Sequence, residues 1–182
     1  MAILDDEALL AIAAYIDVNP VAAGIAEVPE TSEHTSIKVR SEHVDGQGKT
    51  AQLEAAADGS VAGSCASAGL EESLWLCPIE DRRGLDSTRE GMMQGFSLGR
   101  YVQLVDYTGR LFRRGKASIS AELAGIYERP GCSAQSWQAR LEKLNGHRLL
   151  GRFFASTSAK LREIRERLGV RHVVNLASCP AR

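Results

Sequence analysis

The chain has 182 residues, of which 44% are apolar and 25% charged, with a formal net charge of −1. This length suits one ordinary domain or one domain with an appendage, and the composition suits a folded chain rather than a disordered one. No stretch reaches the roughly 18–20 apolar residues of a membrane helix, and the acidic start, Asp5 to Glu7, argues against a signal peptide. We therefore expect no membrane partner.

The near-neutral total hides an uneven distribution of charge. Residues 1–60 hold 11 acidic and 3 basic residues, a net charge of −8, whereas residues 61–182 hold 12 acidic and 19 basic residues, a net charge of +7. A basic C-terminal part favours an anionic partner such as nucleic acid.

The cysteines indicate the compartment. The four are Cys65, Cys77, Cys132 and Cys179, and no two have CxxC spacing or a histidine at zinc-ligand spacing. Free thiols are typical of a reducing cytosol, so we expect a cytoplasmic protein.

A first helix is predicted from the acidic residues near Asp5 to about Asn19. Negative charge is favourable at a helix N-terminus, and Pro20 disfavours helical geometry in the residue before it. Apolar residues cover a broad surface of this helix, so it should pack against a partner element.

Tyr15 and Asn19 lie four residues apart in this predicted helix, and their side chains would therefore share one face. Two interpretations are open. A tyrosine on an Ala/Ile-rich helix is usually a core residue, and an asparagine at a helix end usually forms a cap or turn. Alternatively, the pair presents a phenol and an amide oxygen to one substrate.

The middle of the chain is weakly patterned. Residues 27–40 read as a turn followed by a short polar segment. Residues 41–73 are poor in large apolar residues and rich in Gly, Ala and Ser, which predicts a flexible linker or insertion. A second folded region, residues 74–182, begins near Trp75 and Ile79.

The region after residue 96 reads as short helices joined by tight turns. Each predicted helix follows a serine that can cap it: Ser97, Ser118 or Ser120, Ser133, and Ser156 or Ser158. Trp137, Leu141 and Leu144 share one face of the third of these helices. The fold class expected for the whole chain is mainly α.

This region is also strongly basic, with 16 basic and 6 acidic residues from Ser97 to Arg182. Such an excess on a small helical unit is typical of a nucleic-acid binder, although a solvated basic surface would have the same composition. The candidate DNA-binding residues are Arg100, Arg110, Arg113, Arg114, Lys116, Arg162 and Arg165.

Two stretches resemble a known family. The run YIDVNPVAAGIAEVPE, from Tyr15 to Glu30, resembles the end of the catalytic domain in REP-associated tyrosine transposases, which belong to the single-tyrosine HUH superfamily. The run GFSLGRYVQLVDYTGRLFR, from Gly95 to Arg113, is similar to a C-terminal segment of many bacterial transposase-like proteins. The resemblance covers residues 1–40 and about 74–182.

The resemblance implies chemistry for both residues of the pair. Tyr15 would be the nucleophile that attacks a phosphodiester in single-stranded DNA, and Asn19 would help to hold the Mg²⁺ or Mn²⁺ that polarises the scissile phosphate. One position departs from the family pattern, because Ala22 stands where an arginine is usual.

The same resemblance implies an incomplete centre. The family's metal is held by a His-x-His pair, and the four histidines of this sequence include no such pair. We therefore expect a truncated α/β HUH nuclease domain, reduced to one helix (residues 1–40) and followed by a small multi-helix domain. Such a protein would be inactive alone and would bind no metal. The alternatives are a non-catalytic DNA-binding helical module and an inert remnant.

Overall fold

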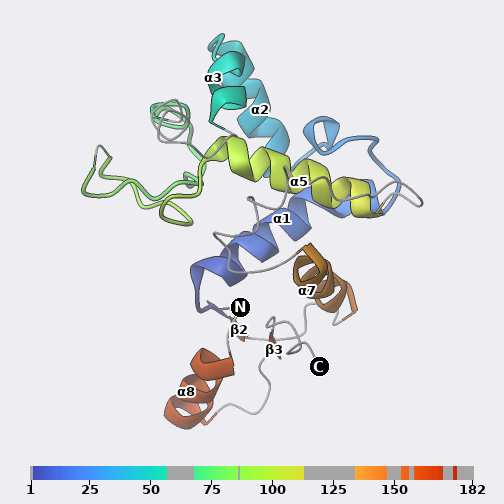
Figure 1. Ribbon diagram of the computed structural model, residues 1–182, viewed down its shortest axis with the longest axis vertical. Helices are drawn as coiled ribbons and strands as arrows, with labels where there is room; N and C mark the ends of the chain where they lie inside the picture. Colours follow the sequence, from blue (N-terminus) through green and yellow to red (C-terminus); the bar gives the residue numbers. More distant parts are fainter. Residues whose placement is uncertain are drawn as a thin grey trace.

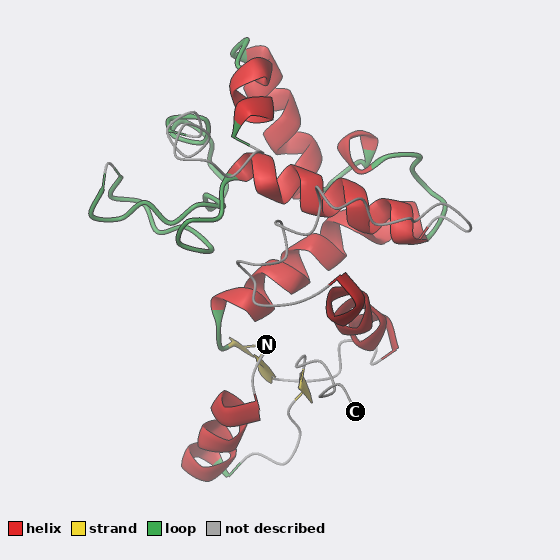
Figure 2. Ribbon diagram, viewed as in Figure 1, coloured by secondary structure: helices red, strands yellow, loops and turns green. Residues whose placement is uncertain are grey.

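The computed structural model describes residues 2–56, 68–85, 87–112, 134–146, 153–155, 158–169 and 174–175. These residues are mainly helical, as expected (Figures 1 and 2). The helices are α1 (Asp6–Ala22), the 3-10 helix η1 (Pro29–Thr31), α2 (Ser36–Gly46), α3 (Thr50–Ala55), α5 (Leu98–Phe112), α7 (Ala134–Gly146) and α8 (Ser158–Leu168).

Helix α1 is longer than the sequence predicted. It starts after Asp5, whose carboxylate accepts a hydrogen bond of 2.8 Å from the Ala8 amide, and it continues through Pro20 to Ala22. The predicted end near Asn19 is therefore wrong. Pro20 removes only its own bond to the Ile16 carbonyl, and Ile16 lies on the exposed side of the helix, where water can satisfy that carbonyl.

Helix α5 crosses α1 and is its main packing partner, with α7 alongside α1 (Figure 1). The predicted cap is confirmed, because Ser97 Oγ accepts a 3.3 Å bond from the Arg100 amide. The predicted shared face of Trp137, Leu141 and Leu144 is also confirmed, since all three are buried. Gly109 lies inside α5, where a Cβ would lie only 3.2 Å from Pro29 Cγ. The absence of a side chain at Gly109 therefore allows α5 to pack closely on η1.

Helices α2 and α3 occupy residues for which the sequence predicted a polar segment and a linker or insertion. Both elements are helical in the structure. Ile37 and Val44 of α2, together with Ala56 directly after α3, belong to the same core that α1 and α5 form. The boundaries of the three predicted domains stay a prediction.

Three short parallel strands lie at the opposite end of the molecule from α2 and α3 (Figure 1). They are β1 (Ala2–Ile3), β2 (Phe153–Ala155) and β3 (Val174–Asn175), in the order β1-β2-β3. Ala2 pairs with Phe153, and Phe154 pairs with Val174, so β2 joins the start of the chain to its last described residues.

One buried carboxylate fixes how α1 meets α2 and α5. Asp17 in α1 is 1% exposed. Its Oδ1 accepts bonds from the backbone amides of Ser36 (2.8 Å) and Ile37 (3.3 Å), and its Oδ2 accepts bonds from the hydroxyls of Ser36 (2.7 Å) and Tyr101 (2.6 Å). Asp17 therefore caps the N-terminus of α2 from a different helix, where a negative charge also meets the positive end of the helix dipole.

A buried ion pair attaches α2 to the long loop before α5. Arg40 pairs with Glu71 and donates a 2.7 Å bond to the Cys77 carbonyl, while Glu71 accepts a 2.9 Å bond from the Ile79 amide. Burial raises the pKa of Glu71, and the neighbouring Arg40 guanidinium opposes that rise. Loss of either partner would leave the other charge buried and unpaired.

Tyr101 yields a testable consequence at alkaline pH. Burial, together with the adjacent Asp17 carboxylate, raises the pKa of Tyr101 well above its usual value. The phenol stays neutral in the folded chain but ionises in the unfolded chain above about pH 10. The contribution of this phenol to the free energy of unfolding is fully present below about pH 10, and it falls by about 1.4 kcal/mol per pH unit above that pH.

Urea unfolding of wild type and Tyr101→Phe between pH 8 and 11 measures this contribution. We expect the alkaline loss of unfolding free energy to be shallower in the variant. Burial also raises the pKa of the Tyr107 phenol, and its contribution to the alkaline loss of unfolding free energy is the same in both proteins. Identical alkaline slopes would contradict the buried Tyr101–Asp17 bond.

Candidate nucleic-acid site on the first helix

The structure places Tyr15 and Asn19 in the same uninterrupted helix, with Asn19 exposed and Tyr15 half-buried against the edge of the core. Because α1 continues to Ala22, both residues have regular helical neighbours on either side. Their side chains therefore lie one turn apart on one side of α1. The Tyr15 ring packs on the core without being fully enclosed, as the first interpretation expects, and the presentation of its phenol to a substrate stays a prediction.

The surface beside this pair is apolar and acidic rather than basic. Ile16 is 53% exposed and Ile25 is 82% exposed. Ile25 and Val28 line a shallow pocket of about 500 Å³ with Glu27 and Glu33. Glu33 pairs with Lys38 and His34 also lines this pocket, so the described residues here carry no excess of positive charge that would attract a DNA strand.

Metal binding at Asn19 would need further ligands. Mg²⁺ takes six oxygen ligands, and the Asn19 amide offers one. Within the described ranges, no three His, Cys, Asp or Glu side chains gather so that they could hold a metal ion. The described residues therefore do not by themselves form a Mg²⁺ or Mn²⁺ site, and Asn19 would hold such an ion only together with ligands from elsewhere.

The predicted DNA-binding residues are only partly described. Arg162 and Arg165 are exposed on α8, and Arg100 is half-buried in the first turn of α5. Arg110 lies within α5, but its side chain is not described. Arg113, Arg114 and Lys116 lie outside the described residues. Helices α8 and α1 both contact β2. Arg162 and Arg165 lie in α8 and Tyr15 lies in α1, so the structure does not bring the three residues together in one element.

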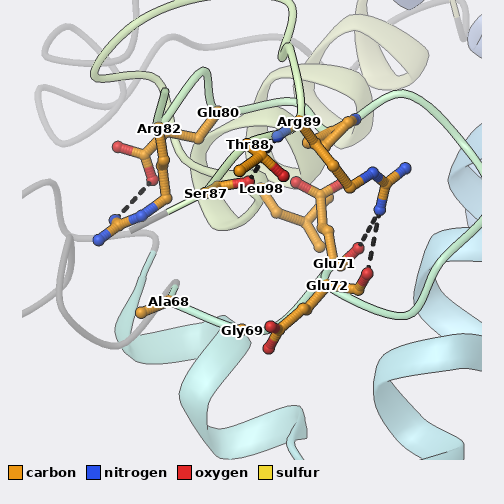
Figure 3. Close-up of a pocket in the computed structure, with 11 residues that line it drawn as sticks. Ala68, Gly69, Glu71, Glu72, Glu80, Arg82, Ser87, Thr88, Arg89 and Leu98 are labelled. Atoms are coloured by element: carbon orange, nitrogen blue, oxygen red, sulfur yellow. Dashed lines mark hydrogen bonds and ion pairs between the residues drawn. The ribbon is translucent and has the colours of Figure 1, made fainter. Parts of the chain in front are cut away.

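The loop before α5 encloses a cavity of about 530 Å³ with several charged side chains (Figure 3). Glu71 pairs with Arg40 of α2, and the two arginines of the lining bond to groups of the loop itself. Arg89 donates to the carbonyls of Glu71 (3.0 Å), Glu72 (3.1 Å) and Leu76 (2.6 Å), and Arg82 pairs with Glu80 at 3.4 Å.

The backbone of this loop also passes close to itself. A Cβ on Gly91 would lie 2.4 Å from backbone atoms of Glu80 and Asp81, so only glycine fits there. Because the arginines are engaged by the loop's own carbonyls and carboxylates, we interpret this cavity as a consequence of loop folding rather than as the site of chemistry.

The residues that sequence reasoning missed are Asp17, Arg40 and Glu71. Asp17 had a readable signal, because it is an acidic residue on the side of α1 that carries Leu10 and Val21. Such a residue is buried only when donors surround it. The pairing of Arg40 with Glu71 had no such signal, because 31 residues separate them.

Comparison of the chain with protein-family models, with curated proteins and with solved structures gave no match. In the part of the chain that the structure describes, no helix has both the length and the apolar character that crossing a membrane requires.

Proposed function

We propose that this chain is a transposase-like protein of DNA transposition in which α1 is the last helix of an HUH nuclease domain. The observation that supports this most is the presentation of Tyr15 and Asn19 on one side of an uninterrupted, anchored helix. In this proposal the Tyr15 phenol oxygen forms a bond to the phosphorus of a DNA phosphodiester while the bond from that phosphorus to one deoxyribose oxygen breaks, and the phenol proton passes to the departing sugar oxygen. The products are a phosphotyrosine link and a free sugar hydroxyl, and Asn19 would offer one oxygen to a Mg²⁺ or Mn²⁺ ion.

The chemistry fits the position of Tyr15. A nucleophile must be held by a rigid element, and the Asp17 bonds to α2 and α5 hold α1 two residues away. A neutral phenol is a weak nucleophile, so the reaction would need a phosphate polarised by a metal. Because the sequence contains no His-x-His pair, the remaining metal ligands would have to come from outside this chain.

Photo-crosslinking tests whether Tyr15 lies at the DNA. With Tyr15 replaced by p-benzoylphenylalanine, irradiation in the presence of a single-stranded hairpin DNA should give a covalent protein–DNA band. The matched control carries the same replacement at Trp75, which is 80% exposed but lies in the loop before α5. Crosslinking at position 75 and none at position 15, at saturating DNA, would contradict the proposal.

The same hairpin tests whether the chain is a complete enzyme. With Mn²⁺ and without irradiation, wild type should form no covalent adduct, because one amide oxygen does not make a metal site. An adduct that forms in wild type and disappears in Tyr15→Phe would show that the chain alone carries the full centre.

A second candidate function is a non-catalytic DNA-binding module. The exposure of Arg162 and Arg165 on α8 favours it, because both guanidiniums can reach phosphates without displacing packed residues. This function needs neither Tyr15 nor a metal.

The salt dependence of binding tests this candidate. If about six phosphates are neutralised, the logarithm of affinity for duplex DNA should fall with log salt with a slope of about −5. The double variant Arg162→Ala/Arg165→Ala should make the slope shallower by about 2. Lys38→Ala is the control, since Lys38 already pairs with Glu33 and Glu42 in the acidic half. A flat salt dependence in wild type would contradict the DNA-binding module.

A further inference from the structure

Helices α2 and α3 lie beside the first part of α5 (Figure 1). A second pocket, separate from Tyr15 and from the loop cavity, is lined by residues of these three helices. Its volume is about 420 Å³, which lies within the usual range for sites that bind small molecules. Val44 from α2, Leu53 from α3 and Val102 from α5 supply its apolar side chains. Val44 is buried, and the other two are half-buried against the main core.

Three carboxylates surround this apolar floor. Glu30 belongs to η1, Asp45 to the last turn of α2, and Glu54 to α3. Asp45 accepts a 3.1 Å bond from the Thr50 hydroxyl, and none of the three carboxylates forms an ion pair with a described residue. The pocket lies at the junction of η1, α2, α3 and α5 and is lined by three carboxylates. No described basic side chain in its lining neutralises them.

Basic residues near the pocket in sequence do not line it. Lys49, which lies between Asp45 and Thr50, directs its ammonium to the Gly69 carbonyl at 3.5 Å. Arg100 follows the pocket residue Gly99 but is not among the lining residues. The chain therefore places no cation of its own among the described side chains of this pocket.

The helix dipoles do not reverse this field. The pocket borders the first turn of α5, whose positive end corresponds to about half a unit charge, and the last turn of α2, whose negative end has a similar magnitude. These two contributions oppose each other, so the three full carboxylate charges decide the sign.

We propose that this pocket binds an organic cation with a short aliphatic body, of the linear diamine or polyamine class. The methylene groups would pack on Val44, Leu53 and Val102, and the ammonium groups would reach the carboxylates at the rim, as lysine side chains do when they lie along apolar surfaces. An apolar floor under an anionic rim favours such a ligand over a metal ion, which has no apolar part, and over an uncharged ligand. This inference does not depend on the proposed function of Tyr15.

The test uses 1,4-diaminobutane as the probe on the whole chain. Titration calorimetry should give saturable binding with a dissociation constant on the order of 0.1–1 mM, which is within reach of a ligand of this size. The methyl NMR signals of Val44, Leu53 and Val102 should shift together. 1,4-Butanediol, which keeps the aliphatic body but lacks charge, and Mg²⁺, which has charge alone, should each bind at least tenfold more weakly.

Two variants distinguish binding at the pocket carboxylates from a general attraction of the diamine to an acidic protein surface. Asp45→Asn/Glu54→Gln should weaken diamine binding by about two- to fivefold for each charge removed. Asn keeps an acceptor for the Thr50 hydroxyl, so the fold should survive. Glu42→Gln is the matched control, because Glu42 is an exposed carboxylate of α2 that does not line the pocket.

Three outcomes would overturn the proposal: no saturable binding of the diamine, equal weakening by the control variant, or equal binding of butanediol or Mg²⁺. Absence of diamine binding would show that the pocket does not take this ligand. Equal weakening by Glu42→Gln would show that overall charge, not the pocket, causes the effect. Equal binding of butanediol would show that the carboxylates are not needed, and equal binding of Mg²⁺ would show that the apolar side chains are not needed.

Discussion

The Asp17 carboxylate is the interaction on which the described structure depends. It lies inside the protein, accepts four hydrogen bonds and connects α1 to the N-terminus of α2 and to α5. A buried carboxylate is favourable only when donors replace the water that it loses, and bonds to a charged group each contribute about 1.5–3 kcal/mol. These donors come from residues 36, 37 and 101, so the bonds form only when the three helices meet.

This anchor also determines what α1 presents to its surroundings. With Asp17 turned inward, Leu10, Ala14 and Val21 lie on the buried side, while Ile16 and Asn19 lie on the outer side and Tyr15 lies at the boundary. The proposed DNA site and the proposed cation pocket therefore occupy different parts of the molecule. The first is the outer side of α1, and the second lies among the helices that Asp17 holds to it.

Local sequence signals predicted much of the helical structure, and long-range contacts explain the errors. The Ser97 cap, the apolar face of Trp137 and Leu141, and the mainly helical class were readable, because caps and helical periodicity act within a few residues. The end of α1 was misplaced because Pro20 lies close to the C-terminal end of the helix, where it removes one hydrogen bond to a carbonyl on the exposed side without ending the helix. Residues 36–40 belong to the predicted polar segment and residues 41–46 to the predicted linker. Their helix is held by Asp17 and by the Arg40–Glu71 pair, which no local pattern reveals.

Some features of the candidate sites could likewise be predicted from local sequence, and others depend on tertiary packing. The spacing of Tyr15 and Asn19 predicted that they share one side of a helix, and the structure places them so. The candidate DNA-binding residues Arg162 and Arg165 are exposed on α8, which both a DNA-binding surface and a solvated basic surface would require. The pocket between α2, α3 and α5 could not be predicted, because its carboxylates come from three elements whose approach depends on tertiary packing.

A double-mutant cycle between Asp17 and Tyr101 tests the central claim most directly. The unfolding free energies of wild type, Asp17→Asn, Tyr101→Phe and the double variant, measured by urea denaturation at pH 7, give the coupling between the two side chains. The account predicts a coupling of about 1 kcal/mol or more for Asp17 with Tyr101, and additivity within about 0.5 kcal/mol when Tyr101→Phe is replaced by Arg162→Ala in the cycle. Additive effects of Asp17→Asn and Tyr101→Phe would contradict it.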